Sequence, residues 1–270
     1  MSSLPMPDRL PGIKSVIAVG SGKGGVGKST VAANLALALM QEKSRVGLLD
    51  ADIYGPSIPI MFGIPEGERP TVAAGNRILP LKRYDMPLMS MGFLMGPKEA
   101  VIWRGPMLSK MLQQFLEQVD WGELGYLIVD LPPGTGDVQL SLSQMIPMTG
   151  AVVVTTPQDV ALADVRRAIK MFEMTKVPIL GIVENMSTFE CPHCKKESRI
   201  FGGKQDQYKE WGLPLLGSIP LEVETRVAGD EGTPIVVKAP KSRQADCFRA
   251  IARKIKEFQD LRKGFELPSL

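Results

Sequence analysis

Eight consecutive residues carry the clearest chemistry of this sequence, because positions 22–29 spell G-K-G-G-V-G-K-S. This is the G-x-x-x-x-G-K-[ST] phosphate loop, with an additional lysine, Lys23, directly after its first glycine. In such loops the backbone N–H groups surround the phosphates of a nucleotide, the final lysine reaches the β- and γ-phosphate oxygens, and the hydroxyl binds Mg²⁺. The sequence therefore predicts a nucleotide site in which Lys28 contacts phosphate and Ser29 contacts Mg²⁺.

Two further segments place carboxylates where apolar runs end. Asp50 ends one run and Asp52 follows it, whereas Asp130 ends a run of four apolar residues that is typical of a Walker-B strand. Ligands of open α/β sheets bind beyond these strand ends. We expect Asp50 and Asp130 to hold Mg²⁺ directly or through water, and Asp52 to orient or deprotonate the attacking water. The alternative for Asp52 is a loop or helix-capping aspartate. The Pro/Gly-rich loop at 131–136 is expected to sense the γ-phosphate.

Along the chain, segments with strand-like patterns alternate with segments with helix-like patterns. This alternation predicts an α/β fold of the three-layer P-loop NTPase type, with a mostly parallel central sheet flanked by helices on both faces. Residues 65–82 interrupt the pattern and predict a surface excursion with a small hairpin. The expected strands are 15–19, 45–50, 86–91, 126–130, 151–155, 179–184 and 215–219. The expected helices are 29–41, 105–119, 137–145, 161–174, 204–211 and 242–263.

Composition narrows the class of protein. The 270 residues favour one large domain, which we place at 13–264 between tails at 1–12 and 265–270. The net charge of +3 is spread along the chain, so no nucleic-acid partner is expected. No apolar run approaches the ~20 residues that span a bilayer, and the first residues lack a secretory or mitochondrial leader pattern. We therefore expect a cytoplasmic protein, or a mitochondrial matrix protein if this is a processed form.

The cysteines suggest a second kind of site. Cys191 and Cys194 form a C-P-H-C motif, whose two thiols can chelate one soft metal but cannot complete a tetrahedral site. Cys247 lies in an apolar helix pattern and is expected to be a buried core residue. Two copies of the motif facing each other across a two-fold axis would supply four thiolates, for a four-iron cluster or for zinc. Thiol–disulfide chemistry and a purely structural turn are the alternatives.

The motifs together resemble the Mrp-type iron–sulfur carrier ATPases, which belong to the deviant-Walker-A class of P-loop proteins. The resemblance extends from about residue 13 to residue 237. It rests on segments 22–29, 50–57, 130–137, 156–159, 184–187 and 191–194. The short N-terminal region lacks the extra domain of many bacterial members and the four cysteines of many eukaryotic cytosolic members, so it is similar to the mitochondrial members.

The resemblance implies a homodimer that holds a labile 4Fe-4S cluster between its subunits and transfers it to apo-proteins under the control of ATP. Lys23 would then reach the nucleotide phosphates across the dimer interface, and Asn185 would contact the adenine. Cys191 and Cys194 would hold the cluster, and Lys23, Lys28 and Asp52 would serve ATP hydrolysis. The expected nucleotide-binding set is Gly22, Lys23, Gly24, Gly25, Val26, Gly27, Lys28, Ser29, Thr30 and Asn185.

Two other functions remain open from the sequence. A membrane-surface or partition-type ATPase is suggested by the C-terminal segment, where Phe248, Ile251, Ile255 and Phe258 share one helical face among basic residues. Packing of this apolar stripe on the sheet is the simpler explanation. A zinc-bridged structural dimer is the other possibility, because four thiolates accept either metal.

Overall fold

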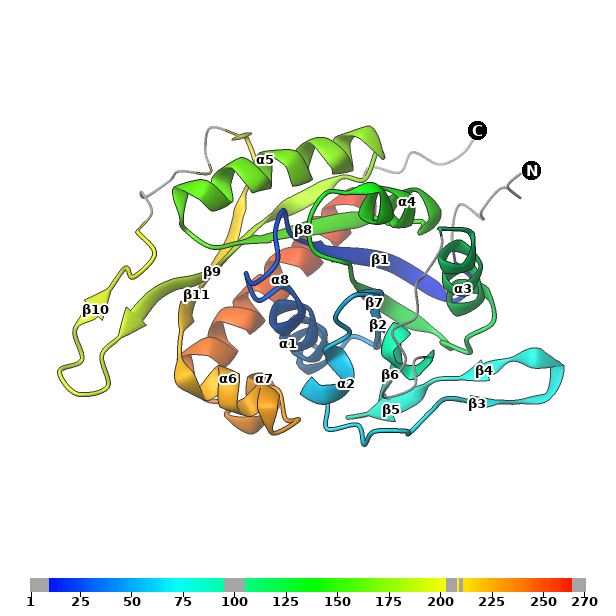
Figure 1. Cartoon of the computed structure of the whole chain (residues 1–270). Helices are drawn as coiled ribbons and strands as arrows, with labels where there is room; N and C mark the ends of the chain where they lie inside the picture. The colour runs from blue at the N-terminus through cyan, green and yellow to red at the C-terminus, as the bar shows by residue number, and fades with distance from the viewer. Residues whose placement is uncertain (1–9, 95–104, 203–207, 209–210, 264–270) are drawn as a thin grey trace.

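The computed structural model describes residues 10–94, 105–202, 208 and 211–263. Its centre is a nine-stranded sheet in the order β10-β9-β8-β1-β7-β2-β6-β5, with β11 paired to β9 (Figure 1). The inner strands are parallel, and β5 and β10 are antiparallel to their neighbours. The expected fold class is therefore confirmed.

The strands have the following bounds. They are β1 (Ile13–Gly20), β2 (Val46–Asp50), β3 (Thr71–Val72), β4 (Ile78–Leu79), β5 (Leu81–Arg83), β6 (Met86–Ser90), β7 (Leu124–Asp130), β8 (Gly150–Thr155), β9 (Ile179–Glu190), β10 (Glu197–Ser198) and β11 (Leu215–Leu221). The central strands are buried on both faces, as expected for parallel strands covered by helices.

Helices cover both faces of the sheet. They are α1 (Lys28–Gln41), α2 (Ile58–Met61), α3 (Gly105–Glu117), α4 (Asp137–Met145), α5 (Asp159–Met174), α6 (Val223–Asp230), α7 (Ile235–Lys238) and α8 (Arg243–Lys263), with short 3₁₀ helices at Ala74–Asn76 and Met91–Leu94. One hydrophobic core forms where α1, α7 and α8 pack on the sheet, and a second forms beneath α3, α4 and α5 on the opposite face (Figure 1). Two cores on the two faces make the three layers that the alternation predicted.

Most expected elements are present, and the differences have local causes. The hairpin expected within 65–82 is the pair β3–β4. Strand β9 continues six residues past the expected end at Glu184, because β11 and β10 extend its hydrogen-bonded ladder. The short helices α2, α6 and α7 were not predicted, since four to eight residues give too little periodicity to recognise. The helix expected at 204–211 lies largely outside the described residues, as do most of the tails at 1–12 and 265–270.

The long C-terminal helix resolves one alternative. Phe248, Ile251 and Ile255 are buried in the core shared with α1, and Phe258 packs against that core. The expectation that the stripe packs on the body of the domain is therefore confirmed. Among the described residues, no helix has both the length and the apolar character required to cross a membrane. Cys247, expected to be buried, is only half-buried, because it lies at the edge of the stripe rather than at its centre.

Candidate functional site

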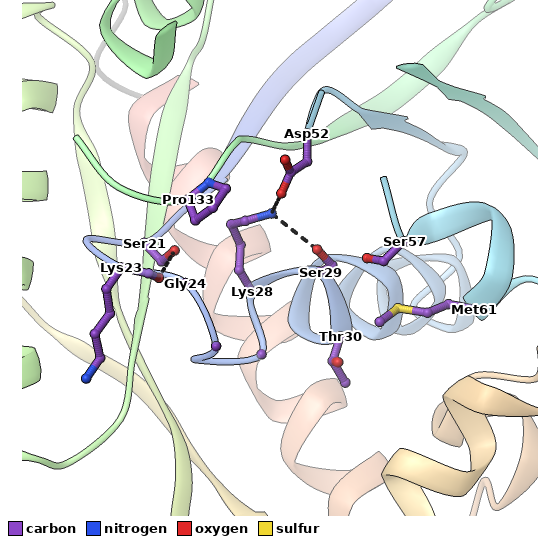
Figure 2. Close-up of a pocket in the computed structure, with 12 residues that line it drawn as sticks. Ser21, Lys23, Gly24, Lys28, Ser29, Thr30, Asp52, Ser57, Met61 and Pro133 are labelled. Atoms are coloured by element: carbon purple, nitrogen blue, oxygen red, sulfur yellow. Dashed lines mark hydrogen bonds and ion pairs between the residues drawn. The ribbon is translucent and has the colours of Figure 1, made fainter. Parts of the chain in front are cut away.

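The phosphate loop lies at the carboxyl edge of the sheet and borders a cleft of about 240 Å³. It connects β1 to α1, so the N-terminal end of α1, which carries Lys28, Ser29 and Thr30 in its first turn, faces the cleft (Figure 2). A helix N-terminus stabilises bound phosphate through its free N–H groups and its dipole. The cleft is lined by Ser21, Lys23, Gly24, Gly25, Gly27, Lys28, Ser29, Thr30, Asp52, Ser57, Met61 and Pro133.

Lys28 is held at the centre of the predicted carboxylates. Its ammonium group donates to Asp130 Oδ1 at 2.7 Å and lies 3.4 Å from Asp52 Oδ2. It also lies 3.2 Å from Ser29 Oγ, an approach visible in Figure 2. All three charged side chains are almost fully buried. The carboxylates therefore compensate the charge of Lys28 in the place where phosphate oxygens would otherwise do so.

Three adjacent strands bring the acidic groups together. Asp50 on β2 is in register with Asp130 on β7 and with Ser90 on β6. Ser90 Oγ donates to Asp50 Oδ2 at 2.9 Å, and the Asp52 N–H donates to Asp50 Oδ1 at 3.1 Å. Burial, assisted by the nearby charge of Asp130, raises the pKa of Asp50 to about 8. Burial also raises the pKa of Asp130, against the opposing effect of Lys28.

The acidic residues at the carboxyl edge of the sheet suit a bound magnesium ion. Asp130 Oδ2 is buried and has no hydrogen-bond partner, so one carboxylate oxygen remains available. Asp52 and Asp130 both pair with a single buried lysine, which leaves an excess of negative charge that a divalent cation would offset. Oxygen donors are the ligands that Mg²⁺ prefers, and it usually keeps several waters. Ser29 and Asp130 are thus suitable to hold Mg²⁺ directly or through water. Both Asp50 oxygens already accept hydrogen bonds, including one from the Ile58 N–H, so the predicted role of Asp50 toward Mg²⁺ stays a prediction.

The two oxygens of the Asp52 carboxylate have different partners. Oδ1 accepts the backbone N–H groups of Tyr54 and Gly55 at 3.2 and 3.3 Å, and Oδ2 faces Lys28. The first oxygen therefore shapes the loop after β2, as the loop alternative expected, but it caps no helix, because α2 begins only at Ile58. The second oxygen faces the cleft, where an attacking water would need an acceptor. The two interpretations of Asp52 are compatible, because they use different oxygens.

Lys23 lines the cleft near its backbone, but its ammonium group points away from the cleft. Figure 2 shows its side chain extending from the loop in a direction opposite to Lys28. Its ammonium group donates to Gln158 Oε1 at 3.1 Å, just before helix α5. Lys23 therefore does not reach the phosphate position beside Lys28.

Asn185 lies behind the phosphate loop and does not line the cleft. Its side-chain amide donates to the Val26 carbonyl at 2.8 Å. Gly27 beside it has a φ of +79°, and a Cβ atom there would lie 2.2 Å from Asn185 Nδ2. The loop is therefore seated closely on β9, and glycine is required for this approach. The predicted adenine contact of Asn185 stays a prediction.

The two cysteines lie in a turn at the tip of the β9–β10 hairpin, which projects from the sheet in Figure 1. Two backbone hydrogen bonds close the turn, from the Cys191 N–H to Lys196 O at 3.0 Å and from the Lys195 N–H to Cys191 O at 2.9 Å. Hydrogen bonds from the backbone N–H groups of Cys194 and His193 lower the pKa of Cys191. The turn therefore favours a thiolate, the form that binds metal.

The surroundings of this turn favour a metal ligand over a redox cysteine. The turn is followed by strand β10, whereas thiol–disulfide motifs place their first cysteine at the start of a helix. Cys191 is half-buried and Cys194 is exposed, so both are accessible. Within the described ranges, no three His, Cys, Asp or Glu residues cluster to hold a metal ion. Two thiolates per chain therefore require ligands from elsewhere.

Four cleft residues were not in the predicted site set, and one of them, Ser21, directly precedes the phosphate loop. Pro133 follows β7 in the Pro/Gly loop that was expected to sense the γ-phosphate, and the next residue, Gly134, donates its N–H to Ser21 O at 3.0 Å. Ser57 and Met61 come from α2 and its N-terminus. Ser57 ends the 50–57 motif, so its place in the site could have been predicted from the sequence. Met61 lies in no motif, and the helix that carries it, α2, was not predicted.

Comparison with known proteins gives concordant results. Residues 12–256 match the model of a ParA-type family described as the NUBPL iron-transfer P-loop NTPase. The chain is 54% identical to the iron-sulfur cluster carrier protein of Aquifex aeolicus, over 91% of this chain and 68% of that protein. It is 50% identical to the iron-sulfur cluster transfer protein NUBPL of Dictyostelium discoideum, over 91% and 77%. A nucleotide-binding protein from Archaeoglobus fulgidus, solved with ADP and with Co found in it, superposes with a TM-score of 0.76 at 39% identity, over 89% and 94%.

Proposed function

This chain belongs to the NUBPL iron-transfer family of P-loop NTPases, and on that premise we propose that it is an ATP-dependent carrier of 4Fe-4S clusters. The observation that carries the proposal is the preorganised turn of Cys191 and Cys194. Its backbone N–H groups favour the thiolate, and its position at a hairpin tip leaves both sulfurs accessible. The cluster is the cargo of the protein, held by thiolates and released to an apo-protein.

The shortage of thiolates supports a homodimeric carrier. A 4Fe-4S cluster takes four cysteine ligands, and each chain offers two at the turn. A two-fold dimer that places the two hairpin tips together supplies the remaining two. We therefore propose that the cluster lies on the symmetry axis, bound by Cys191 and Cys194 of each subunit. Apo iron–sulfur proteins would be the partners that receive it.

The nucleotide cleft supports ATP hydrolysis as the driving reaction. Lys28 and the loop N–H groups would neutralise charge on the γ-phosphate while water attacks in line. Asp52 Oδ2, which faces the cleft, would orient that water or accept its proton. Mg²⁺, held by Ser29, Asp50 and Asp130, would supply further neutralisation of the phosphates. Lys23, whose ammonium group points away from its own cleft, would reach the phosphates bound by the partner subunit.

The chemistry of the cysteines also indicates the cellular compartment of the protein. Free thiols that bind metal persist in reducing compartments, so the proposed location is the cytoplasm or, for a processed form, the mitochondrial matrix. Zinc is the alternative metal at the turn, because thiolates accept both. Reconstitution with iron and sulfide distinguishes the cluster from zinc.

Anaerobic reconstitution with iron and sulfide tests the proposal. The wild type should gain a broad absorbance near 400 nm and about four iron atoms per dimer, as expected for four thiolate ligands. Cys191→Ser and Cys194→Ser should lose both, whereas the matched control Cys247→Ser should keep them because Cys247 lies in helix α8. A wild type that binds only zinc, or a Cys191→Ser protein that binds iron normally, would contradict the carrier function.

A further inference from the structure

Strand β9 connects the nucleotide cleft directly to the cysteine turn. Asn185 contacts the phosphate loop, and Cys191 begins the turn six residues later. At a rise of ~3.3 Å per residue, these positions are separated by at most about 20 Å of chain. A single strand therefore runs from the residue that is hydrogen-bonded to the loop to the start of the cysteine turn. A change in the loop can therefore reach the cysteines through one element.

The strand has an irregularity at the residue after Asn185. Met186 has a φ of +56°, in the left-handed region that a methionine rarely adopts. In a regular strand, consecutive side chains point to opposite faces. Here the left-handed residue interrupts that alternation, and Met186 also approaches the loop: a Cβ atom on Gly27 would lie 3.6 Å from Met186 Cε. Asn185 and Met186 therefore both lie beside the same loop.

The pairing of β9 changes at the same place. Its pairing with β8 ends at Glu184, and its pairing with β10 begins at Phe189. Between them β9 is paired only with β11, in a ladder whose register shifts between Ile219 and Leu221. Residues 185–188 thus have less lateral support than the segments on either side. A strand bends most easily where its ladder is interrupted.

Beyond the irregularity the strand is again firmly held. Thr188 Oγ1 donates to Glu197 Oε1 at 2.7 Å, and Arg243 of α8 donates to the same carboxylate oxygen at 2.8 Å. The Cys191 N–H then closes the turn on Lys196 O. Hydrogen bonds thus hold the hairpin tip together, and because of its sparse pairing we expect the segment beside the phosphate loop to be the flexible part of β9.

We propose that Met186 is a positioning residue which, together with Asn185, couples occupation of the nucleotide cleft to the geometry of the cysteine turn. Nucleotide binding reshapes the loop at Val26 and Gly27, the contacts of Asn185 and Met186 transmit this change to the flexible segment, and the hairpin tip reorients. This inference rests on the proposed function, because the regulated site is the cluster-binding turn. Strain at a left-handed residue is typical of switch segments.

The test measures the alkylation rates of Cys191 and Cys194 by iodoacetamide in the metal-free full-length protein. Rates are compared without nucleotide and with saturating ATP and Mg²⁺. In the wild type we expect ATP to change these rates by about fivefold or more, the lower range of typical coupling between two sites. Met186→Asn should abolish most of this change while the protein still binds ATP. Asparagine accepts the left-handed conformation, so the substitution removes the long methionine side chain beside Gly27 and keeps the backbone.

Two additional variants keep the test decisive. Met186→Gly also accepts the left-handed conformation and should give the same loss if Met186→Asn fails to fold. Met174→Asn is the matched control, because Met174 is exposed at the end of α5 and should keep the full response. An unchanged rate in the wild type, or a full response in the folded Met186 variants, would overturn the coupling. Because no cluster is present, failure to load iron would contradict the proposed function without affecting this readout.

Discussion

The ammonium group of Lys28 donates to Asp130 Oδ1 at 2.7 Å, with both side chains almost fully excluded from solvent. This ion pair gives the lysine of the phosphate loop a buried carboxylate partner. We therefore expect the phosphates of ATP to compete with Asp130 for Lys28, and the displaced carboxylate to bind Mg²⁺. The ion pair would thus link the binding of the two ligands.

Removal of one partner of this pair should destabilise the fold. Lys28→Met leaves Asp130 buried without its cation, and such a change costs about 3–5 kcal/mol. The double variant Lys28→Met/Asp130→Asn removes both charges and should recover most of the lost free energy of unfolding. Urea denaturation of the four proteins measures the coupling. Additive destabilisation in the double variant would show that the two groups act independently.

Magnesium and ATP should release a proton when they bind near neutral pH. Burial raises the pKa of Asp50 to about 8, so this group carries a proton at pH 7 in the nucleotide-free protein. A cation beside it favours the carboxylate and lowers that pKa. Proton release should therefore occur below about pH 8 and decline above it, where Asp50 is already ionised.

Calorimetric titration at pH 7 in two buffers of different ionisation enthalpy measures the proton count. Asp50→Asn should abolish the buffer dependence, whereas Asp137→Asn, at the start of α4, should keep it. Equal release in wild type and Asp50→Asn would assign the proton to another group.

Two neighbouring glycines should tolerate alanine very differently. A Cβ atom at Gly22 would lie 2.1 Å from the Asp164 carbonyl oxygen of α5, so the loop or the helix must move. A Cβ atom at Gly24 would meet only Pro133, at 3.9 Å. Overpacking costs about 1–3 kcal/mol, and because relief of the clash moves the loop away from its phosphate-binding shape, Gly22→Ala should lose roughly tenfold in ATP affinity. Gly24→Ala should stay close to the wild type in fluorescence titrations, and equal affinities would refute the close packing of the loop on α5.

The direction of Lys23 predicts a role between subunits. If Lys23 reaches the partner's phosphates, Lys23→Ala should reduce ATP-dependent dimer formation much more than it reduces ATP binding by one chain. Gln158→Ala, which removes only the contact within the chain, should leave the dimer intact or favour it. Sedimentation velocity with ATP and Mg²⁺ distinguishes the two variants. A Lys23→Ala protein that dimerises like the wild type would contradict this role.

Sequence patterns predicted the fold and the cleft well because both depend on local signals. The phosphate loop, the apolar strands and the aspartates at strand ends are contiguous motifs, and the structure places Asp50, Asp52 and Asp130 around Lys28. Contacts between distant segments were not predictable. Tertiary packing produces the hydrogen bond from Asn185 to the phosphate loop and the left-handed conformation of Met186. It also produces the hydrogen bond between Lys23 and Gln158. The six extra residues of β9 depend on pairing with β10 and β11, which no single segment reveals.

Transfer of a cluster to an apo-protein is the direct test of the proposed carrier function. The wild type, loaded anaerobically and separated from free iron and sulfide, is mixed with the apo form of a four-iron enzyme in the presence of an iron chelator. We expect the enzyme to regain activity with a yield that follows the cluster supplied, and Cys191→Ser protein treated in the same way to restore none. Recovery that the chelator abolishes, or equal recovery with the Cys191→Ser protein, would contradict the carrier function.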